Sequence, residues 1–528
     1  MSAAATTPAP AEGAGMTHRQ ILEAMSGLLL GMFVAILSST IVSAALPTII
    51  GDLGGTQSSY TWVVTSTLLA LTVSTPIWGK LADLFDRKLL VQTGLTIYVV
   101  GSIFAGLSQS TGQLIGWRVV QGIGVGGLTA LVQVILSDLV SPRERGRYTG
   151  YLGAVFGLGT VAGPLIGGVV TDSIGWRWCF YVAVPFAVAA FIVLQRTLKL
   201  PPKAKRKVSI DYVGATLIAG GVSSLLIWVS LAGQQFDWVS GMTALLIGIG
   251  VVLIAAAVYT ERRVREPIVP LRLFENRTVV LAVIASVAVG IAMFGTTVFL
   301  NQYMQIARGY SPTESGLLSI PMVIGLFGAS TIIGRKVSQT GRYKNYMMLG
   351  AVLLTVGLGL MGIIDESTSL LEIAVFLILL GSGVGMLMQN LVLVVQNAVS
   401  THDIGSGSSL IAFFRSMGGA IGVSVMGALL ATHASNSIAE GLGKLGVGGS
   451  GVSDGQVPDI STLPGPVKDV VEHAYGTGIA EMFLIAAPLG IVALIAVALL
   501  REVPLGAKSG IELAREQREQ REAAPQAA

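Results

Sequence analysis

Apolar runs of about twenty residues, separated by charged or Pro/Gly-containing breaks, follow one another along almost the whole chain. A helix needs roughly 20 such residues to cross the hydrocarbon core of a bilayer. The sequence therefore predicts an all-α membrane protein with about fourteen spans. They fall near residues 27–47, 61–79, 90–108, 112–138, 149–171, 178–198, 212–232, 240–260, 278–303, 315–334, 345–364, 370–397, 406–432 and 478–500.

Composition agrees with this pattern and excludes several other classes of protein. Charged residues make up only 12% of the 528 residues, against roughly 25% in soluble domains. The net charge of +4 comes from basic residues in short segments between spans, so we expect no nucleic-acid partner. The single cysteine, Cys179, excludes an internal disulfide and a cysteine-based metal cluster. The sequence has no Walker-type phosphate loop, so we expect no ATP, no other cofactor and no metal.

The densest cluster of charge in the first hundred residues is the segment from Gly79 to Lys88, between the second and third spans. Its basic residues place it on the cytoplasmic side by the positive-inside rule. When the loops alternate from a cytoplasmic N-terminus, most other loop Lys and Arg residues fall on the same side. The opposite side receives only Arg177, Arg308, Lys444 and Lys468. Both termini are therefore expected in the cytoplasm.

The order of the spans predicts two six-helix bundles with two inserted helices. The expected units are a disordered cytoplasmic N-terminus (1–24), a first bundle (25–200), two additional spans (201–265), a second bundle (266–503) and a cytoplasmic tail (504–528). Segment 433–477 of the second bundle is rich in Gly, Ser and Asp, and we expect a flexible or weakly structured outside loop there. Gly334 and Arg342 follow the tenth span with the spacing of Gly79 and Arg87, and such repeats are typical of transporters that rock about a central site.

The segment Gly-x-Leu-Ala-Asp-x-Phe-Asp-Arg-Lys that begins at Gly79 resembles the signature between the second and third helices of the major facilitator superfamily. Asp83 is placed to cap a helix N-terminus or to pair with an Arg across the bundle interface. Such a contact, made in one conformation and broken in the other, is a two-state latch. The alternative is a solvated loop that only fixes topology. The expected gate residues are Gly79, Asp83, Arg87, Lys88, Gly334 and Arg342.

Arg118 and Gln121 lie in the fourth span, in the pattern Leu-x-x-x-Arg-x-x-Gln-Gly. An arginine inside a membrane costs about 3 kcal/mol or more, so it is expected to face a partner or a watery cavity. The resemblance implies that this motif takes part in proton coupling, and a structural ion pair or carbonyl clamp is the alternative. No Asp or Glu is predicted near a membrane midplane. The deepest candidates for carrying the proton are Glu481 and Glu314, with Asp138 at the inner end of the fourth span.

The fifth span contains the glycine-rich pattern Gly159-x-x-x-Gly163-Pro164-x-x-Gly167-Gly168. In a membrane helix these residues allow close packing and a kink. The pattern matches the fifth-helix signature of drug:proton antiporters at every defining position, and an ordinary tight helix crossing is the alternative. With Arg415-x-x-Gly-Gly-Ala in the thirteenth span, roughly residues 25–500 resemble the fourteen-helix drug:proton antiporter family, which includes bacterial multidrug and quaternary-ammonium exporters.

Three positions depart from that family, and they affect the expected substrate. Ser38 stands where the first helix usually carries an Asp, Thr67 where a Tyr is common, and Ala183 where an Asn is common. Loss of the first-helix acid weakens the case for a cationic substrate. A broad apolar cavity with a few polar groups accommodates varied amphipathic molecules, although the same groups can instead tie helices together. The expected lining residues are Ser38, Thr67, Asn301, Gln305, Gln389, Asn390 and Arg415.

The resemblance implies a proton-coupled antiporter that exports hydrophobic or amphipathic compounds, such as drugs, antibiotics and dyes, from the cytoplasm. Its expected partners are a small-molecule substrate, protons and the lipid bilayer, and we expect a monomer in the cytoplasmic membrane of a bacterium. A dedicated metabolite exporter or permease on the same fold is the first alternative, and a membrane sensor without transport is the second. An enzyme has almost no support, because the four histidines are scattered and no nucleophile or metal constellation is present.

Overall fold

The computed structural model describes residues 18–54, 57–198, 211–233, 235–264, 267, 269–310, 312–400, 403–445 and 464–505. Fourteen helical segments within these ranges are long and apolar enough to cross a membrane, which confirms the predicted all-α membrane protein. The elements in chain order are α1 (His18–Asp52), α2 (Gln57–Leu84), α3 (Arg87–Gly106), α4 (Thr111–Leu139), α5 (Pro142–Ser173), α6 (Trp178–Tyr181), α7 (Ala183–Thr197), α8 (Tyr212–Leu231), α9 (Gly241–Glu261), η1 (Leu271–Glu275), α10 (Arg277–Gln302), η2 (Tyr303–Ala307), α11 (Pro312–Leu318), α12 (Ile320–Thr340), α13 (Lys344–Met361), α14 (Leu370–Ala398), α15 (Ile404–Lys444) and α16 (Gly465–Leu499).

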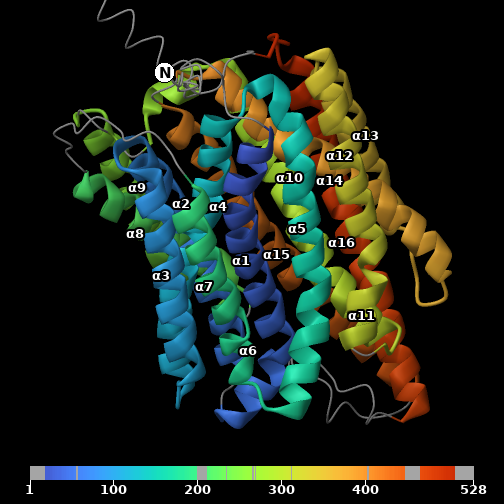
Figure 1. Cartoon of the computed structure of the whole chain (residues 1–528). Helices are drawn as coiled ribbons and strands as arrows, with labels where there is room; N and C mark the ends of the chain where they lie inside the picture. The colour runs from blue at the N-terminus through green and yellow to red at the C-terminus, as the bar shows by residue number, and fades with distance from the viewer. Residues whose placement is uncertain are drawn as a thin grey trace, which may run out of the picture.

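Helices α1 to α7, here called the first half, bury two sets of apolar side chains against one another. Figure 1 shows how these helices are arranged. Helices α2 and α3 both pack against α4, and α1 packs against α5 and α7. Glycines bring these backbones close together. A Cβ at Gly124 would lie 2.7 Å from the backbone nitrogen of Tyr98, so α3 and α4 meet without a side chain between them.

Helices α10 to α16, here called the second half, enclose a separate apolar core. Helix α12 packs against α14, α10 against α15, and α13 against α14 and α16. Two predicted spans are modified here. The ninth continues into the short π-helix η2, and the tenth is divided into α11 and α12 around Ser319.

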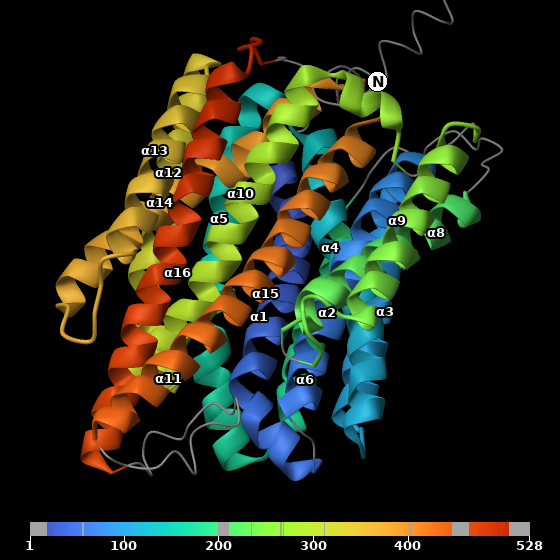
Figure 2. The same cartoon turned by 180° about the vertical axis from the view of Figure 1, so that it is seen from behind.

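Helices α8 and α9 pack against each other, and α8 also contacts α2 and α15, so the pair stands beside both halves (Figure 2). The Ser224 hydroxyl donates to the carbonyl of Leu246 at 2.7 Å and joins the two helices. The outward side chains of α9 are apolar, with Leu245, Val251 and Val252 more than half exposed. An exposed apolar face on a membrane helix is suited to contact with lipid.

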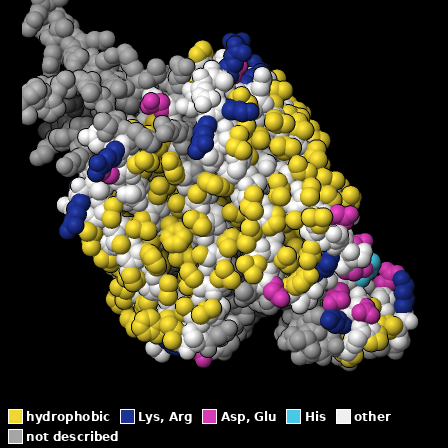
Figure 3. All heavy atoms as spheres, turned by 45° about the vertical axis from the view of Figure 1, so that its right-hand side comes forward, with side chains coloured by type: hydrophobic (Ala, Val, Ile, Leu, Met, Phe, Trp, Pro, Cys, Tyr) yellow, Lys and Arg dark blue, Asp and Glu magenta, His cyan; other side chains and the backbone are white. Residues whose placement is uncertain are grey.

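Hydrophobic side chains cover most of the face seen in Figure 3, and many of its Lys and Arg side chains gather toward one end. Helix α1 begins and α16 ends at this same end, where α2 also passes into α3 (Figures 1 and 2). We call it the α2–α3 end. The membrane-spanning helices therefore run between a strongly basic end and an opposite end, as expected for a multi-pass membrane protein.

Helices occupy more of segment 433–477 than the sequence predicts. Helix α15 continues to Lys444 and α16 already begins at Gly465, while 446–463 lies outside the described residues. The helices extend because they bury apolar side chains against each other beyond the membrane-length stretch, among them Ile438 and Val471. The composition of the segment therefore gives a poor indication of its ends.

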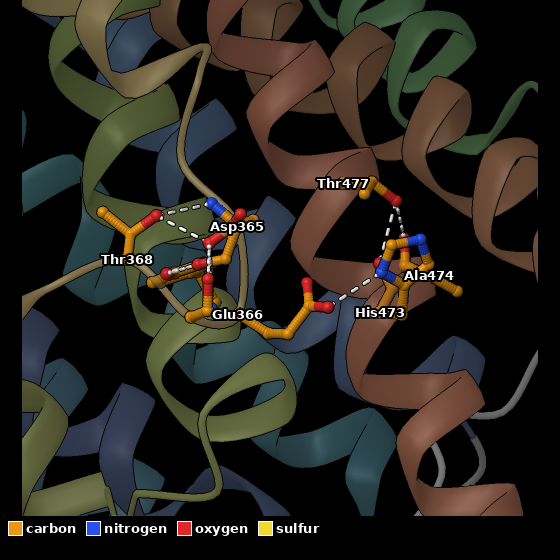
Figure 4. A network of polar contacts seen from close by, with 8 residues as sticks. Asp365, Glu366, Thr368, His473, Ala474 and Thr477 are labelled. Atoms are coloured by element: carbon orange, nitrogen blue, oxygen red, sulfur yellow. Dashed lines mark hydrogen bonds and ion pairs between the residues drawn. The ribbon is translucent and has the colours of Figure 1, made fainter.

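A polar network fixes the loop between α13 and α14 at the end opposite the α2–α3 end (Figure 4). The Glu366 carboxylate lies 2.9 Å from Nδ1 of His473 on α16. Hydroxyl and backbone N–H groups of Ser367 and Thr368 donate to Asp365 and lower the pKa of its carboxyl group. This loop is thereby tied to the extension of α16.

Candidate functional site

Asp83 contacts the start of α15 across the interface between the two halves. Its carboxylate accepts hydrogen bonds from the backbone N–H of Gly405 at 3.0 Å, from the backbone N–H of Ser406 at 3.0 Å and from the Ser406 hydroxyl at 2.9 Å. A carboxylate is favourable at a helix N-terminus because the unpaired N–H groups and the helix dipole both attract it. Of the two arrangements open to Asp83, the structure shows the helix cap.

Glycines on both helices make this contact possible. A Cβ at Gly79 would lie 2.9 Å from the carbonyl oxygen of Gly405 and would overlap the Ser409 side chain, and a Cβ at Gly405 would lie 2.7 Å from the carbonyl oxygen of Gly79. Both distances are shorter than real Cβ contacts, so any larger residue would push α2 and α15 apart. The two halves are closed against each other at the α2–α3 end.

The neighbouring gate residues hold the first half together at this end. Arg87 forms a buried ion pair with Asp138 at the end of α4, and its Nε donates to the carbonyl of Ala82 at 3.2 Å. Lys88 donates to the carbonyl of Gln195 on α7 at 2.8 Å. Removing one partner of a buried ion pair leaves an uncompensated charge and costs about 3–5 kcal/mol. These contacts hold the ends of α2, α3, α4 and α7 together next to Asp83, which contacts α15.

The repeat of the Gly79–Arg87 spacing, formed by Gly334 and Arg342, has different surroundings. Gly334 is buried within α12, whereas Arg342 is exposed just after Gly341, which ends the helix with a φ of 69°. A positive φ at this position favours glycine and stops the helix. The role of Gly334 and Arg342 in a gate stays a prediction.

A second polar contact joins the two halves farther from the α2–α3 end. The side-chain amide of Gln133 on α4 donates to that of Gln389 on α14 at 3.0 Å, and Gln396 donates to the Gln133 carbonyl at 3.4 Å. Gln396 also donates to the hydroxyl of Ser408 on α15 at 2.7 Å. Hydrogen bonds between neutral amide groups break and re-form at a modest net cost in free energy, which suits an interface that opens and closes.

Arg118 lies in a buried network of neutral groups within the first half. Its Nη1 lies 2.5 Å from Oε1 of Gln121, and its Nε is 3.5 Å from the carbonyl of Val63. Gln121 in turn donates to the hydroxyls of Ser38 at 3.1 Å and Ser102 at 2.8 Å. Among the described residues the arginine has no carboxylate partner, so the carbonyl clamp describes it better than the ion pair. Its part in proton coupling stays a prediction.

The predicted carboxylates lie apart from this network. Glu481 on α16 is 2.7 Å from Nδ1 of His433 on α15, in the second half. A Cβ at Gly478 would lie 3.0 Å from the His433 ring, so the glycine one turn earlier leaves space for the imidazole. Glu314 is exposed at the start of α11. The structure therefore does not bring Arg118, Glu481 and Glu314 together.

The glycine-rich pattern of the fifth span packs α5 against α1. A Cβ at Gly159 would lie 2.8 Å from a methyl carbon of Ile36, and one at Gly163 would overlap the Thr40 side chain. The Thr40 hydroxyl donates to the Gly159 carbonyl at 2.9 Å. Gly167 is buried, and its carbonyl accepts a hydrogen bond from Thr171. Gly168 is half-buried, and the side chain of Pro164 lies outside the described set.

Several predicted cavity residues bond to the backbone of their own helix. The side chains of Thr67, Asn301 and Asn390 donate to the carbonyls four residues earlier, at 3.3, 3.0 and 2.6 Å. Gln305 lies in η2 and is half-buried. In this closed conformation, the Thr67, Asn301 and Asn390 side chains are thus held against their own helices.

A small pocket does remain between the halves, near their centre. Its lining is apolar apart from two polar side chains, and Gln389 is the predicted cavity residue that it contains. The pocket is lined by Met32, Leu152, Gly153, Phe156, Leu326, Ser330, Gly385, Met388 and Gln389. In this closed conformation the space is no larger than about one water molecule, so it marks where the two halves meet and is not a formed substrate site.

The model of the Major Facilitator Superfamily matches residues 28–423. The chain belongs to this superfamily of membrane transporters. The sequence is 38% identical over 91% of the chain and 69% of an uncharacterized MFS-type transporter of Mycobacterium tuberculosis. It is 34% identical to the multidrug transporter protein MdtP of Bacillus subtilis, over 79% of the chain and 77% of that protein.

A solved structure supports the same fold. The crystal structure of the human organic anion transporter MFSD10 superimposes with a TM-score of 0.61 over 90% of this chain and 99% of that chain, at 14% identity. This similarity confirms the predicted major facilitator fold and says nothing of the substrate. The protein is thus a multi-pass membrane transporter with multidrug and efflux proteins among its relatives.

Three contact residues were not predicted from the sequence. Ser406, Gln133 and His433 each meet a residue that is distant in the chain or on another helix. The run of small residues after Asp403 is a local sign of close helix contact, but it does not identify α2 as the partner.

Proposed function

We propose that this transporter is a proton-coupled antiporter that expels hydrophobic or amphipathic compounds from the cytoplasm of a bacterium. The observation that carries the proposal is the contact of Asp83 with the start of α15, because it closes one end of the interface with hydrogen bonds that exchange readily for water. Opening at this end and closure at the other would expose a central site alternately to the two sides of the membrane.

The direction of transport follows from the sequence pattern and the relatives. The α5 glycines match the antiporter signature and pack tightly on α1, and relatives at 31–38% identity include proteins named as multidrug transporters and efflux pumps. With the α2–α3 end in the cytoplasm, α1 begins and α16 ends on the cytoplasmic side, in keeping with the proposed cytoplasmic termini. Each proton that enters through the membrane potential supplies about 2.3 kcal/mol per 100 mV, enough to drive a substrate outward.

The first test is the accumulation of a fluorescent amphipathic dye in bacterial cells that express the protein. We expect lower accumulation than in cells with the empty vector, and we expect a protonophore to abolish the difference. Efflux that persists after the protonophore would contradict proton coupling. Net uptake into right-side-out vesicles, driven by the same gradient, would instead support the permease on the same fold.

A further inference from the structure

Arg415 on α15 is a charged side chain without a partner in the described part of the protein. Its Nη1 is fully buried and makes no hydrogen bond, and no ion pair to this arginine is present among those residues. Its own carbonyl packs directly against Gly290 on α10, which fixes the backbone at this position. The Arg415 side chain as a whole is half-buried, but an unpaired guanidinium with a buried N–H donor inside a membrane protein is costly, so its retention needs an explanation.

Arg415 lies close to the middle of the membrane. It is 11 residues beyond Ile404, where α15 begins at the polar α2–α3 end. At 1.5 Å per residue this is about 16 Å along the helix, roughly half of a 30 Å hydrocarbon core. Neither snorkelling to the surface nor a lipid headgroup offers a counter-charge at that depth.

The helix geometry places Arg415 level with the central pocket. Gln396 on α14 bonds to Ser408 on α15 and fixes the register of these two helices. Gln389 lies seven residues before Gln396, and Arg415 lies seven residues after Ser408. Seven residues are almost two turns, so both residues keep the faces of that bonded pair and both lie about 10 Å farther from the α2–α3 end. Gln389 lines the pocket and bonds to Gln133 of the other half.

The carboxylates of the described spans do not neutralise the charge of Arg415. Asp138 is paired with Arg87 at the α2–α3 end, and Glu481 is paired with His433 in the middle of α16, 18 residues before Leu499. Arg118, which is buried, bonds only to neutral groups of the described residues. Among the described residues, Arg415 therefore leaves an uncompensated positive charge at the level of the pocket. A carboxylate or sulfonate fits a guanidinium because two parallel hydrogen bonds form.

We propose that Arg415 binds the anionic group of the substrate and that the transported compounds are amphipathic organic anions with a carboxylate or sulfonate. This inference rests on the proposed export function. It narrows the substrate from amphipathic compounds in general and excludes quaternary-ammonium cations as the preferred cargo. The Gln133 and Gln389 amides at the same level supply neutral hydrogen bonds. When the halves separate, the apolar residues around the small closed pocket contact the hydrophobic body of the substrate.

The test compares two dyes that share a xanthene ring, the anion fluorescein and the cation tetramethylrhodamine methyl ester. In everted vesicles energised with a proton gradient, we expect fluorescein to accumulate and the cation to accumulate about tenfold less. The variant Arg415→Met should lose about tenfold or more of fluorescein transport, and Arg415→Lys should retain part of it. Arg263→Met is the matched control, because Arg263 is exposed at the end of α9 and stacks on Tyr259.

Two measurements on the purified full-length protein distinguish an anion site from a purely structural role of Arg415. Fluorescence polarisation should show fluorescein binding that falls about tenfold in Arg415→Met, and the thermal midpoint without ligand should not fall, because the variant removes an unpaired charge. Absent binding to the wild-type protein, equal binding by the variant, or a lower ligand-free midpoint would overturn the anion site. Arg415-dependent binding without transport of either dye would uphold the site and refute the export function.

Discussion

At the scale of single residues, the closed interface depends on Asp83, because one carboxylate satisfies three donors at the start of α15. We predict that Asp83→Asn lowers dye efflux several-fold, since an amide accepts fewer hydrogen bonds and loses the attraction to the helix dipole. Ser338→Ala, at the equivalent position of the second copy, should have a much smaller effect. Initial efflux rates at matched expression levels measure both. Equal losses in the two variants would contradict the dependence on the first copy.

Residue types and spacing predicted that Asp83 caps a helix or meets an arginine, and the structure shows a cap. The sequence did not indicate which helix it meets, since Asp83 and Ser406 are separated by 323 positions. The same limit applies to Gln133 and Gln389, whose bond joins two apolar runs. Neither run contains a sequence pattern that indicates the other as its partner. Contacts across the interface depend on how the two halves dock. The local hydrophobic periodicity of the sequence carries no information about that docking.

At the scale of elements, close contact between α1 and α5 depends on glycine. Gly163→Leu should abolish most dye efflux, because a side chain there overlaps Thr40 and forces α5 away from α1. Gly328→Ala on α12 is the control, since a Cβ at that position meets nothing within 4 Å. Efflux and the yield of folded protein should be measured together. A Gly163→Leu variant that folds and transports normally would show that this packing has no role in the cycle.

Element types were predictable over nearly the whole described chain, whereas element ends were not. Hydropathy indicates the stretch of a helix that crosses the lipid, so the predicted spans agree with the fourteen membrane-length helices of the structure. It does not mark where a helix stops outside the lipid. Helix α15 runs on to Lys444 because Ile438 and Leu442 pack against α16, and this support comes from a separate region of the chain.

At the scale of the whole molecule, the closed state brings α5 of the first half against α12 of the second half. A Cβ at Gly153 would lie 3.7 Å from the Cβ of Ser330, within the range of about 3.5–4.5 Å found in disulfides. The double variant Gly153→Cys/Ser330→Cys should therefore cross-link under mild oxidation. Alternating access requires these helices to separate, so we predict that oxidation stops dye efflux and that a reductant restores it.

The two single-cysteine variants are the matched controls for this experiment, and oxidation should leave their efflux unchanged. The native Cys179 is buried, so it should not compete for the cross-link. Mobility on a non-reducing gel after cleavage between the halves reports how much protein is linked, and efflux is measured on the same sample. If fully linked protein still transports at the rate of the reduced protein, α5 and α12 stay together throughout the cycle. The opening would then have to occur elsewhere, and the contact of Asp83 with α15 would lose its role as the latch between two states.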